Sequence, residues 1–364
     1  MKYRKLTFMM IFLSVLLFVY LQPVFFPFST NSKPHSNTMI NNQPKTNQSQ
    51  TANLPADKYA QMIGQDYTKM KSQFSTELSA VETGYGYTQH LFVNQDNHYH
   101  TDIITRNNKI HAITVFGNSG KINDDFRLGM NLEDILKKTE ISAIVTINNQ
   151  SNEYQFELSE EDMNYRPLVH FDNQVFAIFY FHQVTGKLFA IRYFDANYLL
   201  KSAPYQLIGG NYGKFDVENN PINWDHISVE KAKYLLTVLN LFSSGVEYSW
   251  EDSSVSASSL LNQITLTPEK FLSTSRILQL NQMRKQRNMP YFSFTNDELK
   301  NLLEANHLQN TSGIFLTPAV DCMDIALQLQ TDPILHNKML SNQSKTLSIA
   351  FHKQDMLVLL LDKR

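Results

Sequence analysis

Residues 186–207, GKLFAIRYFDANYLLKSAPYQL, decide how this chain is divided. Residues 187–194 show the alternation that is typical of a strand. Asp195 then begins a short helical segment, residues 196–201, which stops before Pro204. A strand, a short helix and a proline in this order predict the end of one domain and the start of another.

Length and composition allow two ordinary domains. The chain has 364 residues, of which 42% are hydrophobic and 18% are charged, so it is long and apolar enough for a sizeable core. The net charge of −2 gives no electrostatic reason to bind nucleic acid. A single cysteine, Cys322, excludes an internal disulfide framework and a metal site built from several cysteines.

The N-terminus predicts a transmembrane helix. Lys2, Arg4 and Lys5 precede an uncharged apolar run over residues 6–28, which comes close to spanning a bilayer. The basic residues place the N-terminus in the cytoplasm and the rest of the chain outside. Bulky residues 25–28 stand where signal cleavage needs small ones, so we expect an uncleaved single-pass anchor in the cell membrane. Secretion after signal cleavage is the alternative.

Residues 29–56 predict a tether. They are mostly Asn, Gln, Ser, Thr, Lys and Pro, and they hold too few apolar side chains to offset the entropy of ordering. We expect a disordered extracellular segment between the membrane anchor, residues 1–28, and the folded part.

The first region, residues 57–210, contains an internal repeat. Gly64 and Gly129 each precede one short amphipathic helix and then strand-like segments. The expected helices cover residues 67–74 and 132–138, and the expected strands cover 85–93, 99–106, 109–116, 143–147, 154–158, 175–181 and 187–194. Asn107 and Asn108 predict a tight hairpin between two of these strands. A helix followed by a meander, twice, predicts an α+β module with antiparallel sheet.

The second region, residues 226–364, has a different pattern. Apolar residues at helical spacing predict helices over residues 229–242, 253–263, 297–306 and 318–330. Two strand-like runs, 346–352 and 356–361, end the chain. Helices followed by a terminal hairpin predict a second layered α+β domain.

The first region resembles the CAP-associated N-terminal module of Gram-positive surface proteins. The resemblance covers residues 61–207 and rests on Ile63-Gly64, Arg127-Leu128-Gly129-Met130, Phe189-Ala190-Ile191-Arg192-Tyr193, and Leu199-Leu200-Lys201 before Pro204-Tyr205. In that family the module precedes a CAP domain, the α-β-α sandwich of cysteine-rich secretory and pathogenesis-related proteins.

The second region resembles a degenerate CAP domain over residues 226–361. The segments that carry this resemblance are 235–240, 298–308 with 311–314, 319–329 with 332–333 and 336–340, and 347–351. The resemblance implies an α-β-α sandwich and a cavity in which many members offer histidines and acidic residues to a divalent metal.

Departures from the CAP pattern argue against chemistry in that cavity. Ser312 stands at the glutamate of the Gly-Glu-Asn-Ile motif. The two histidine positions fall within residues 258–261 and near residues 271–274, which contain no histidine, so only His336 remains. One imidazole cannot supply the three or four ligands of a zinc site. We therefore expect no metal, no cofactor and no catalytic residue.

A histidine cluster is the other metal candidate. His98 and His100 share one face of an expected strand, with Asp96, Asp102, His90 and His111 nearby. No third ligand is fixed by spacing, so we favour a solvated polar strand face.

The remaining candidates favour structural roles. The basic run of residues 283–287, Met-Arg-Lys-Gln-Arg, could meet acidic polymer or lipid, but three charges indicate a solvated loop or helix end instead. Glu160, Glu161 and Asp162 suit the first turn of a helix. Cys322, beside apolar residues of an expected helix, indicates a small buried side chain and not a nucleophile.

The sequence therefore predicts a non-enzymatic, membrane-tethered extracellular protein that binds or scaffolds at the Gram-positive cell envelope. Its expected partners are the membrane, through the N-terminal helix, and a cell-wall or surface-protein component. A cell-wall or peptide hydrolase and a lipid or small-molecule binding protein stay open as alternatives. Arg192, Tyr193 and Tyr205 are expected at the interface between the two regions.

Overall fold

The computed structural model describes one compact unit within Gln50–Arg364. The residues that it describes are 53–93, 99–123, 125–209, 212–217, 221–243, 247–250, 257–287, 289–308, 311–332, 334–336, 339 and 346–361. The predicted anchor and most of the predicted tether lie outside these residues. Among the described residues, no helix combines the length and the apolar character that crossing a membrane requires.

The first region is built on a seven-stranded antiparallel sheet with the strand order β1-β2-β3-β4-β11-β10-β9. The strands are β1 (Thr76–Glu82), β2 (Thr88–Val93), β3 (Tyr99–Arg106), β4 (Lys109–Gly117), β9 (Leu168–His170), β10 (Val175–Phe181) and β11 (Leu188–Asp195). Asn107 and Asn108 both have positive φ, as the predicted tight hairpin requires. The expected strand over residues 85–93 is shorter than predicted, because Thr83–Tyr87 form a turn, and β1 was not predicted.

The sheet consists of two meanders that join at β4 and β11. The N–H of Gly64 donates to Ile110 at the start of β4, and the N–H of Gly129 donates to Leu188 at the start of β11. Both glycines have positive φ, which glycine adopts without strain. The two glycine turns of the predicted internal repeat therefore make equivalent backbone hydrogen bonds to the sheet.

Short helices and two small sheets complete the first region. The helices are α2 (Lys58–Met62), α3 (Tyr67–Met70), a 3-10 turn η1 (Lys71–Gln73), α4 (Leu132–Leu136), α5 (Glu160–Tyr165) and α6 (Ala196–Ser202). A three-stranded sheet has the order β12-β8-β7, from β7 (Ile144–Asn149), β8 (Asn152–Glu157) and β12 (Gln206–Ile208), and β5 (Gly120–Lys121) pairs with β6 (Arg127–Leu128). The strands of the first region that follow Gly129 are thus divided between two sheets, whereas β1, β2, β3 and β4, which follow Gly64, share one.

The segment before the first helix extends the β9 edge of the large sheet. Leu54 forms a parallel bridge with Phe171 and is buried. Its N–H donates to His170 at 3.0 Å, and its carbonyl accepts from the N–H of Asp172 at 2.8 Å. Leu54 therefore adds a very short eighth segment to this edge of the sheet.

Residues 186–207 have the predicted strand and helix. β11 is followed by α6, and Asp195 caps this helix by accepting a hydrogen bond from the N–H of Tyr198 at 2.7 Å. The helix ends at Ala203, which adopts the left-handed conformation before Pro204.

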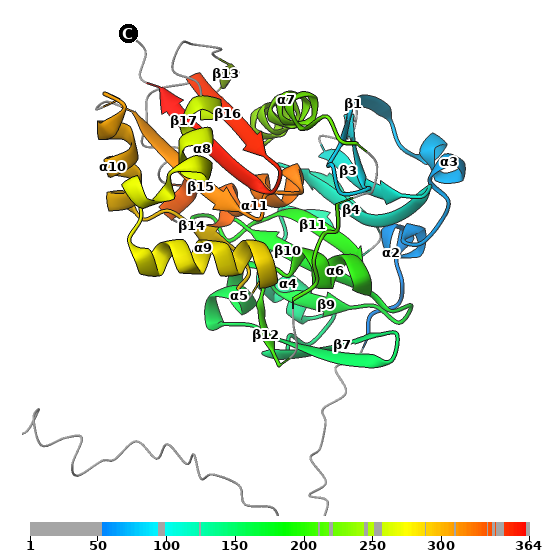
Figure 1. The fold of residues 1–364 in the computed structure, drawn as a ribbon. Coiled ribbons are helices and arrows are strands. Elements are labelled where there is room, and N and C mark those ends of the chain that lie inside the picture. Colours follow the sequence, from blue (N-terminus) through cyan, green and yellow to red (C-terminus); the bar gives the residue numbers. More distant parts are fainter. Residues whose placement is uncertain are drawn as a thin grey trace, which may run out of the picture. The chain divides into compact units, whose positions relative to one another are not determined.

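The second region is an α-β-α sandwich (Figure 1). Its five-stranded sheet has the order β13-β16-β17-β15-β14 and is antiparallel except for the β13–β16 pair. The strands are β13 (Ser249–Trp250), β14 (Phe292–Ser293), β15 (Ser312–Thr317), β16 (Thr346–His352) and β17 (Asp355–Leu361). The helices are α7 (Trp224–Phe242), α8 (Ala257–Leu266), η2 (Pro268–Lys270), α9 (Thr274–Gln286), α10 (Asn296–Ala305) and α11 (Cys322–Thr331). α9 was not predicted as a helix; only its last residues were weighed, as a loop or helix end.

Three apolar clusters hold the layers together. One covers the outer face of the large sheet under α2 and α4, and another joins α8, α9 and α10 to the outer face of the five-stranded sheet. The third contains side chains of both large sheets and of α7 and α11, which lie between them (Figure 1). The two predicted domains are therefore joined by one continuous core, and α7 and α11 pack against both.

Candidate functional site

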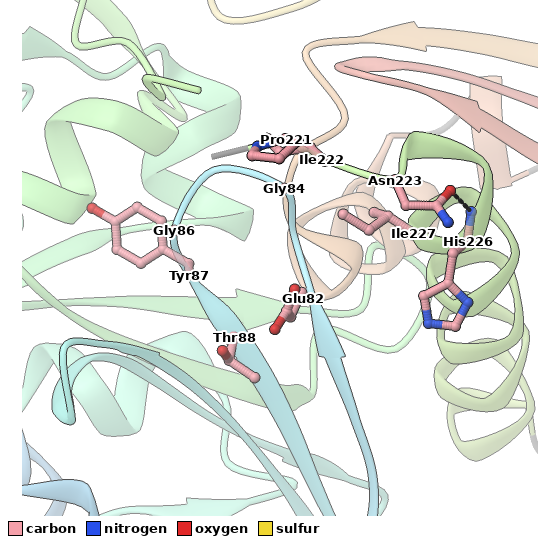
Figure 2. A pocket seen from close by; sticks show the side chains of 10 residues that line it. All are labelled: Glu82, Gly84, Gly86, Tyr87, Thr88, Pro221, Ile222, Asn223, His226 and Ile227. Carbon is pink, nitrogen blue, oxygen red and sulfur yellow. Dashed lines mark hydrogen bonds between the residues drawn. The ribbon is translucent and has the colours of Figure 1, made fainter. Parts of the chain in front are cut away.

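A pocket of about 380 Å³ lies where the β1–β2 turn of the first region meets the start of α7 (Figure 2). Its lining residues are Glu82, Gly84, Gly86, Tyr87, Thr88, Pro221, Ile222, Asn223, His226 and Ile227. They come from two segments that are far apart in the sequence, so the pocket exists only when the two regions are in contact.

Close packing holds the two walls of this pocket together. Gly84 has φ +81°, and a Cβ atom there would lie 2.5 Å from the ring of Trp224. The ring of Tyr85 lies 5.5 Å from that of Trp224. The hydroxyl of Thr83 donates to the carbonyl of Tyr87 at 3.0 Å and closes the turn. Glycine at position 84 thus allows the first turn of α7 to pack directly on the hairpin, and the pocket is preformed.

The polar groups of the pocket suit hydrogen bonding to a small polar molecule. Glu82 is on the strand wall and exposed, and His226 is on the helix wall and exposed (Figure 2). Asn223 accepts from the N–H of His226 at 3.1 Å and so caps α7, which leaves its amide nitrogen available to a ligand. Across the described residues, no group of three or more His, Cys, Asp or Glu is arranged to hold a metal ion.

Deeper in the interface, Asp321 of the second region receives side chains of the first. Arg192 donates a charge-assisted hydrogen bond to Asp321, and both side chains are buried. The hydroxyl of Tyr198 donates to the same carboxylate at 2.6 Å, and the amide of Gln89 donates at 2.9 Å. Burial opposes the charge of Arg192, but the carboxylate of Asp321 outweighs it and raises the pKa of the guanidinium.

A second buried carboxyl, Asp102 on β3, faces the second region. The hydroxyl of Tyr234 on α7 donates to it at 2.5 Å, and the amide of Gln89 donates at 3.3 Å. Burial first, and the charge of Asp321 next, raise the pKa of Asp102 to about 7. The interface therefore contains a hydrogen-bonded network of charged and polar groups that the apolar core surrounds.

Of the three residues predicted at the interface, Arg192 is confirmed there. The prediction is wrong for Tyr193, which points to the opposite face of the sheet and donates to Asp57 at 2.7 Å. Alternation along β11 explains this, because successive side chains of a strand face opposite sides. Tyr205 donates to the carbonyl of Arg166, within the first region.

The described members of the histidine cluster do not converge. His98 and Asp96 lie outside the described residues. His100 packs on Phe116, whereas His90, by strand register, faces the opposite side of the sheet. His111 is hydrogen bonded to Asp195 at 2.5 Å. Each of these three histidines therefore has a different neighbour.

His90 has an arrangement that superficially matches a catalytic triad. One ring nitrogen lies 2.8 Å from Glu77, and the other lies 3.1 Å from the hydroxyl of Thr105. The ring of Tyr67 stacks on His90 at 4.3 Å, and Thr105 is buried. A nucleophile needs access to its substrate, so this arrangement stabilises the sheet and α3.

The positions assigned by the CAP resemblance lie in different surroundings. Leu260 is buried in the apolar cluster under α8, and Thr274, the first residue of α9, is exposed. Ser312 begins β15. The ring of His336 lies 6.0 Å from that of His182 of the first region. His336 thus faces the first region, whereas Leu260 lies on the far face of the five-stranded sheet.

The other candidates have structural partners. Arg287 ends α9, is buried, and donates to the carbonyls of Lys201 and Ser202 at the end of α6. Asp162 forms a capping box with Ser159 at the start of α5, as the predicted first turn requires. Cys322 is fully buried, and burial raises the pKa of its thiol to about 12. The basic run is a helix end, as predicted, but the expectation that it is solvated is wrong for Arg287, which is buried, and Arg284 is paired with Asp355. Cys322 is a buried small side chain.

Sequence reasoning missed most of the interface. Asp321 lies inside the helix expected over residues 318–330, but in the structure it is the N-cap of α11 and accepts from the N–H groups of Met323 and Asp324. Its partners Gln89 and Arg192 are more than 100 residues away in the chain, and a single sequence carries no signal for such pairs.

Comparison with known proteins supports both parts of the predicted architecture. Residues 63–205 match the family model described as CAP-associated N-terminal. An uncharacterized membrane protein of Bacillus subtilis, YlbC, is 31% identical over 150 residues, which make up 41% of this chain and 42% of that relative. The match therefore spans less than half of the relative's length.

Two solved structures share the fold of nearly the whole chain. A cysteine-rich secretory protein of Staphylococcus aureus has a TM-score of 0.61 at 18% identity and covers 86% of this chain and 98% of its own. An extracellular protein of Bacillus anthracis that contains an SCP domain has a TM-score of 0.59 at 18% identity and covers 91% of this chain and 100% of its own. The predicted order, a CAP-associated module followed by a CAP-like domain, is confirmed.

Proposed function

We propose that this chain, a CAP-associated module followed by a CAP-like domain, is a membrane-tethered protein of the cell envelope that binds a partner and catalyses no reaction. Membrane attachment is supported by the apolar run over residues 6–28 and by the description of the Bacillus subtilis relative as a membrane protein. The basic residues before the run favour an extracellular position for the folded part.

The proposal that the protein is not an enzyme rests on the apolar surroundings of Leu260. Residues 258–261, where the CAP resemblance expects a histidine, contain the buried Leu260 and Leu261. Both pack in the apolar cluster with Phe315 of the five-stranded sheet. A leucine side chain has no atom that can bind a metal or transfer a proton, and its burial leaves no polar cavity at this position.

The interface between the regions supports a scaffolding role. Arg192 and Asp321 join the two regions through a buried ion pair, and Arg287 joins α9 to the end of α6. Such contacts hold the two regions in one arrangement, which suits a protein that presents a surface at a distance from the membrane.

The test is an incubation of the compact unit, residues 50–364, with insoluble peptidoglycan and, separately, with casein. We expect the protein to sediment with peptidoglycan and to release no soluble fragments from either substrate. Sustained release of fragments would show a hydrolase and contradict the proposal. A titration with zinc by calorimetry is the second readout, and a stoichiometric site of micromolar affinity or better would contradict the absence of a metal centre.

Binding of a small molecule is the second candidate, and the pocket between the β1–β2 turn and α7 favours it. The exposed Glu82 and His226 in its walls suit a polar ligand better than a lipid. Native mass spectrometry of the purified full chain would show a retained polar molecule, and Glu82→Gln should then weaken its binding.

A further inference from the structure

Two carboxyl groups cross the interface in opposite directions. Asp102 of the first region accepts from Tyr234 of the second, and Asp321 of the second accepts from Arg192 of the first. The side chain of Gln89 connects the two carboxyls, because its amide nitrogen lies 2.9 Å from Oδ1 of Asp321 and 3.3 Å from Oδ2 of Asp102. A change of charge on one carboxyl therefore changes the electrostatic environment and the hydrogen bonding of the other.

The two carboxyls differ in how well a negative charge on them is compensated. Asp321 accepts hydrogen bonds from Arg192, Tyr198, Gln89 and the backbone N–H groups of Met323 and Asp324. Asp102 is fully buried and accepts on Oδ2 only, since its Oδ1 has no partner within the described part of the chain. Asp321 is thus equipped to be an anion and Asp102 is not.

The register of the large sheet shows which polar side chain lies next to Asp102 on the neighbouring strand. Thr114 of β4 lies directly opposite Asp102 of β3 and directly opposite Arg192 of β11. The hydroxyl of Thr114 is buried and, among the described residues, has no hydrogen-bond partner. Oδ1 of Asp102 is also without a partner among these residues, so the two groups make no hydrogen bond with each other and the hydroxyl does not stabilise a negative charge on Asp102.

The charges around Asp102 act in both directions: Asp321 opposes its ionisation, whereas Arg192 favours it. Arg192 is already paired with Asp321, and the amine of Lys231 donates to the carbonyl of Ala319 at 2.7 Å. Burial lowers the pKa of Lys231 to about 8, so its ammonium group loses its proton more easily than that of an exposed lysine. The charged or titratable groups around Asp102 are Arg192 on β11, Tyr198 on α6, Lys231 and Tyr234 on α7, and Asp321, Cys322 and Asp324 on α11.

We propose that the interface between the two regions is pH-dependent: a proton on Asp102 holds β3 against α7, and loss of this proton loosens the contact. An ionised Asp102 repels Asp321 and competes with it for the amide of Gln89. Because its pKa is higher in the closed state than in an open, hydrated one, the contact is strongest in acid. The contribution of Asp102 to its stability falls as pH rises from the ordinary carboxyl range to about 7, and this contribution is constant above that.

Hydrogen exchange of the full chain in a non-ionic detergent tests this proposal. The reporter is the backbone N–H of Cys322, which donates to Oε1 of Gln89 at 2.9 Å across the interface. Amides of β17, inside the second region, are the reference, and all rates are corrected for the intrinsic effect of pH. We expect the opening equilibrium at Cys322 to increase about tenfold per pH unit between about pH 5 and about pH 7, and to level off above it.

Asp102→Asn provides the decisive variant, because an amide of the same shape cannot ionise. Its opening equilibrium should be independent of pH. Asp57→Asn is the matched control: burial also raises the pKa of Asp57, but this residue bonds to Tyr193 on the opposite face of the sheet, so the variant should keep the pH response of the parent. A parent without a pH response, or an Asp102→Asn variant that retains it, overturns the proposal.

A titration of the unsubstituted chain keeps the proposal testable if Asp102→Asn does not fold. With the aspartate carboxyl carbons labelled by carbon-13, the signal of Asp102 is identified by its contact with the ring of Tyr234. A midpoint near 7 for this signal supports the proposal. A midpoint below about 5, close to that of exposed aspartates, overturns it.

Discussion

Substitution of Arg192 by methionine should destabilise the folded unit strongly. Methionine retains much of the unbranched apolar stem but removes the guanidinium, so the packing loss is small and the loss of charge dominates. Arg192 is 0% and Asp321 4% exposed, so water cannot replace the lost partner. Removal of one member of such a buried pair costs about 3–5 kcal/mol.

Unfolding by urea, followed by tryptophan fluorescence, measures this loss. The chain has two tryptophans, and Trp224 packs on the β1–β2 turn at the interface, so its emission reports contact between the regions. Lys233→Met on α7 is the control, because the pair of Lys233 with Glu230 is mostly exposed and is worth at most about 1 kcal/mol.

Two results would refute this reasoning. One is a cost of less than about 1 kcal/mol for Arg192→Met, equal to that of the exposed control. The other concerns the double variant with Asp321→Asn. It should be more stable than the sum of the two single losses predicts, because it leaves no unpaired buried charge. Strict additivity would show that the two side chains do not depend on each other.

Four further substitutions have expected outcomes. Gly84→Ala should displace the ring of Trp224 and shift its emission to longer wavelength. Gly64→Ala, with the same φ and nothing within 4 Å of the new Cβ, should cost only the backbone strain of about 1–2 kcal/mol and leave the emission unchanged. Arg287→Met should lower the free energy of unfolding by about 1–3 kcal/mol, because two carbonyls at the end of α6 lose a buried donor; an unchanged urea midpoint would contradict this. The buried amine of Lys231 has a lowered pKa, so the unfolded chain binds a proton there more tightly than the folded chain does, and the free energy of unfolding should rise between about pH 8 and about pH 10. Lys231→Met should abolish this rise. The measurement is the free energy of unfolding as a function of pH.

Strands with strong apolar character could be predicted from the sequence almost to the residue. β3 and β10 have the predicted bounds, and both are inner strands of the sheet, with five of eight side chains buried in β3 and all seven in β10. β1 is an edge strand with mostly exposed side chains, so it lacks the apolar alternation that identifies a strand. α9 was missed for a similar reason, because only Leu280 and Met283 of this polar helix are buried.

The candidate site was much less predictable. The notable feature of Arg192 in the sequence was its place at the end of a module, and this was enough to predict an interface residue. Its partner Asp321, the bridging Gln89 and the second carboxyl Asp102 are brought together only by the packing of α11 on the large sheet. The pocket is unpredictable for the same reason, since Glu82 and His226 belong to different regions.

The bridge between Leu54 and Phe171 determines how the folded unit would respond to mechanical force. A pull on the chain ahead of Leu54 acts first on the two backbone hydrogen bonds at the edge of β9. β9 is the outermost strand, and five further strands separate it from β1, the pocket and the start of α7. Tension arriving through the N-terminal segment is therefore taken up at one end of the large sheet, and the contact between Gly84 and Trp224 at the other end is the last to bear the load.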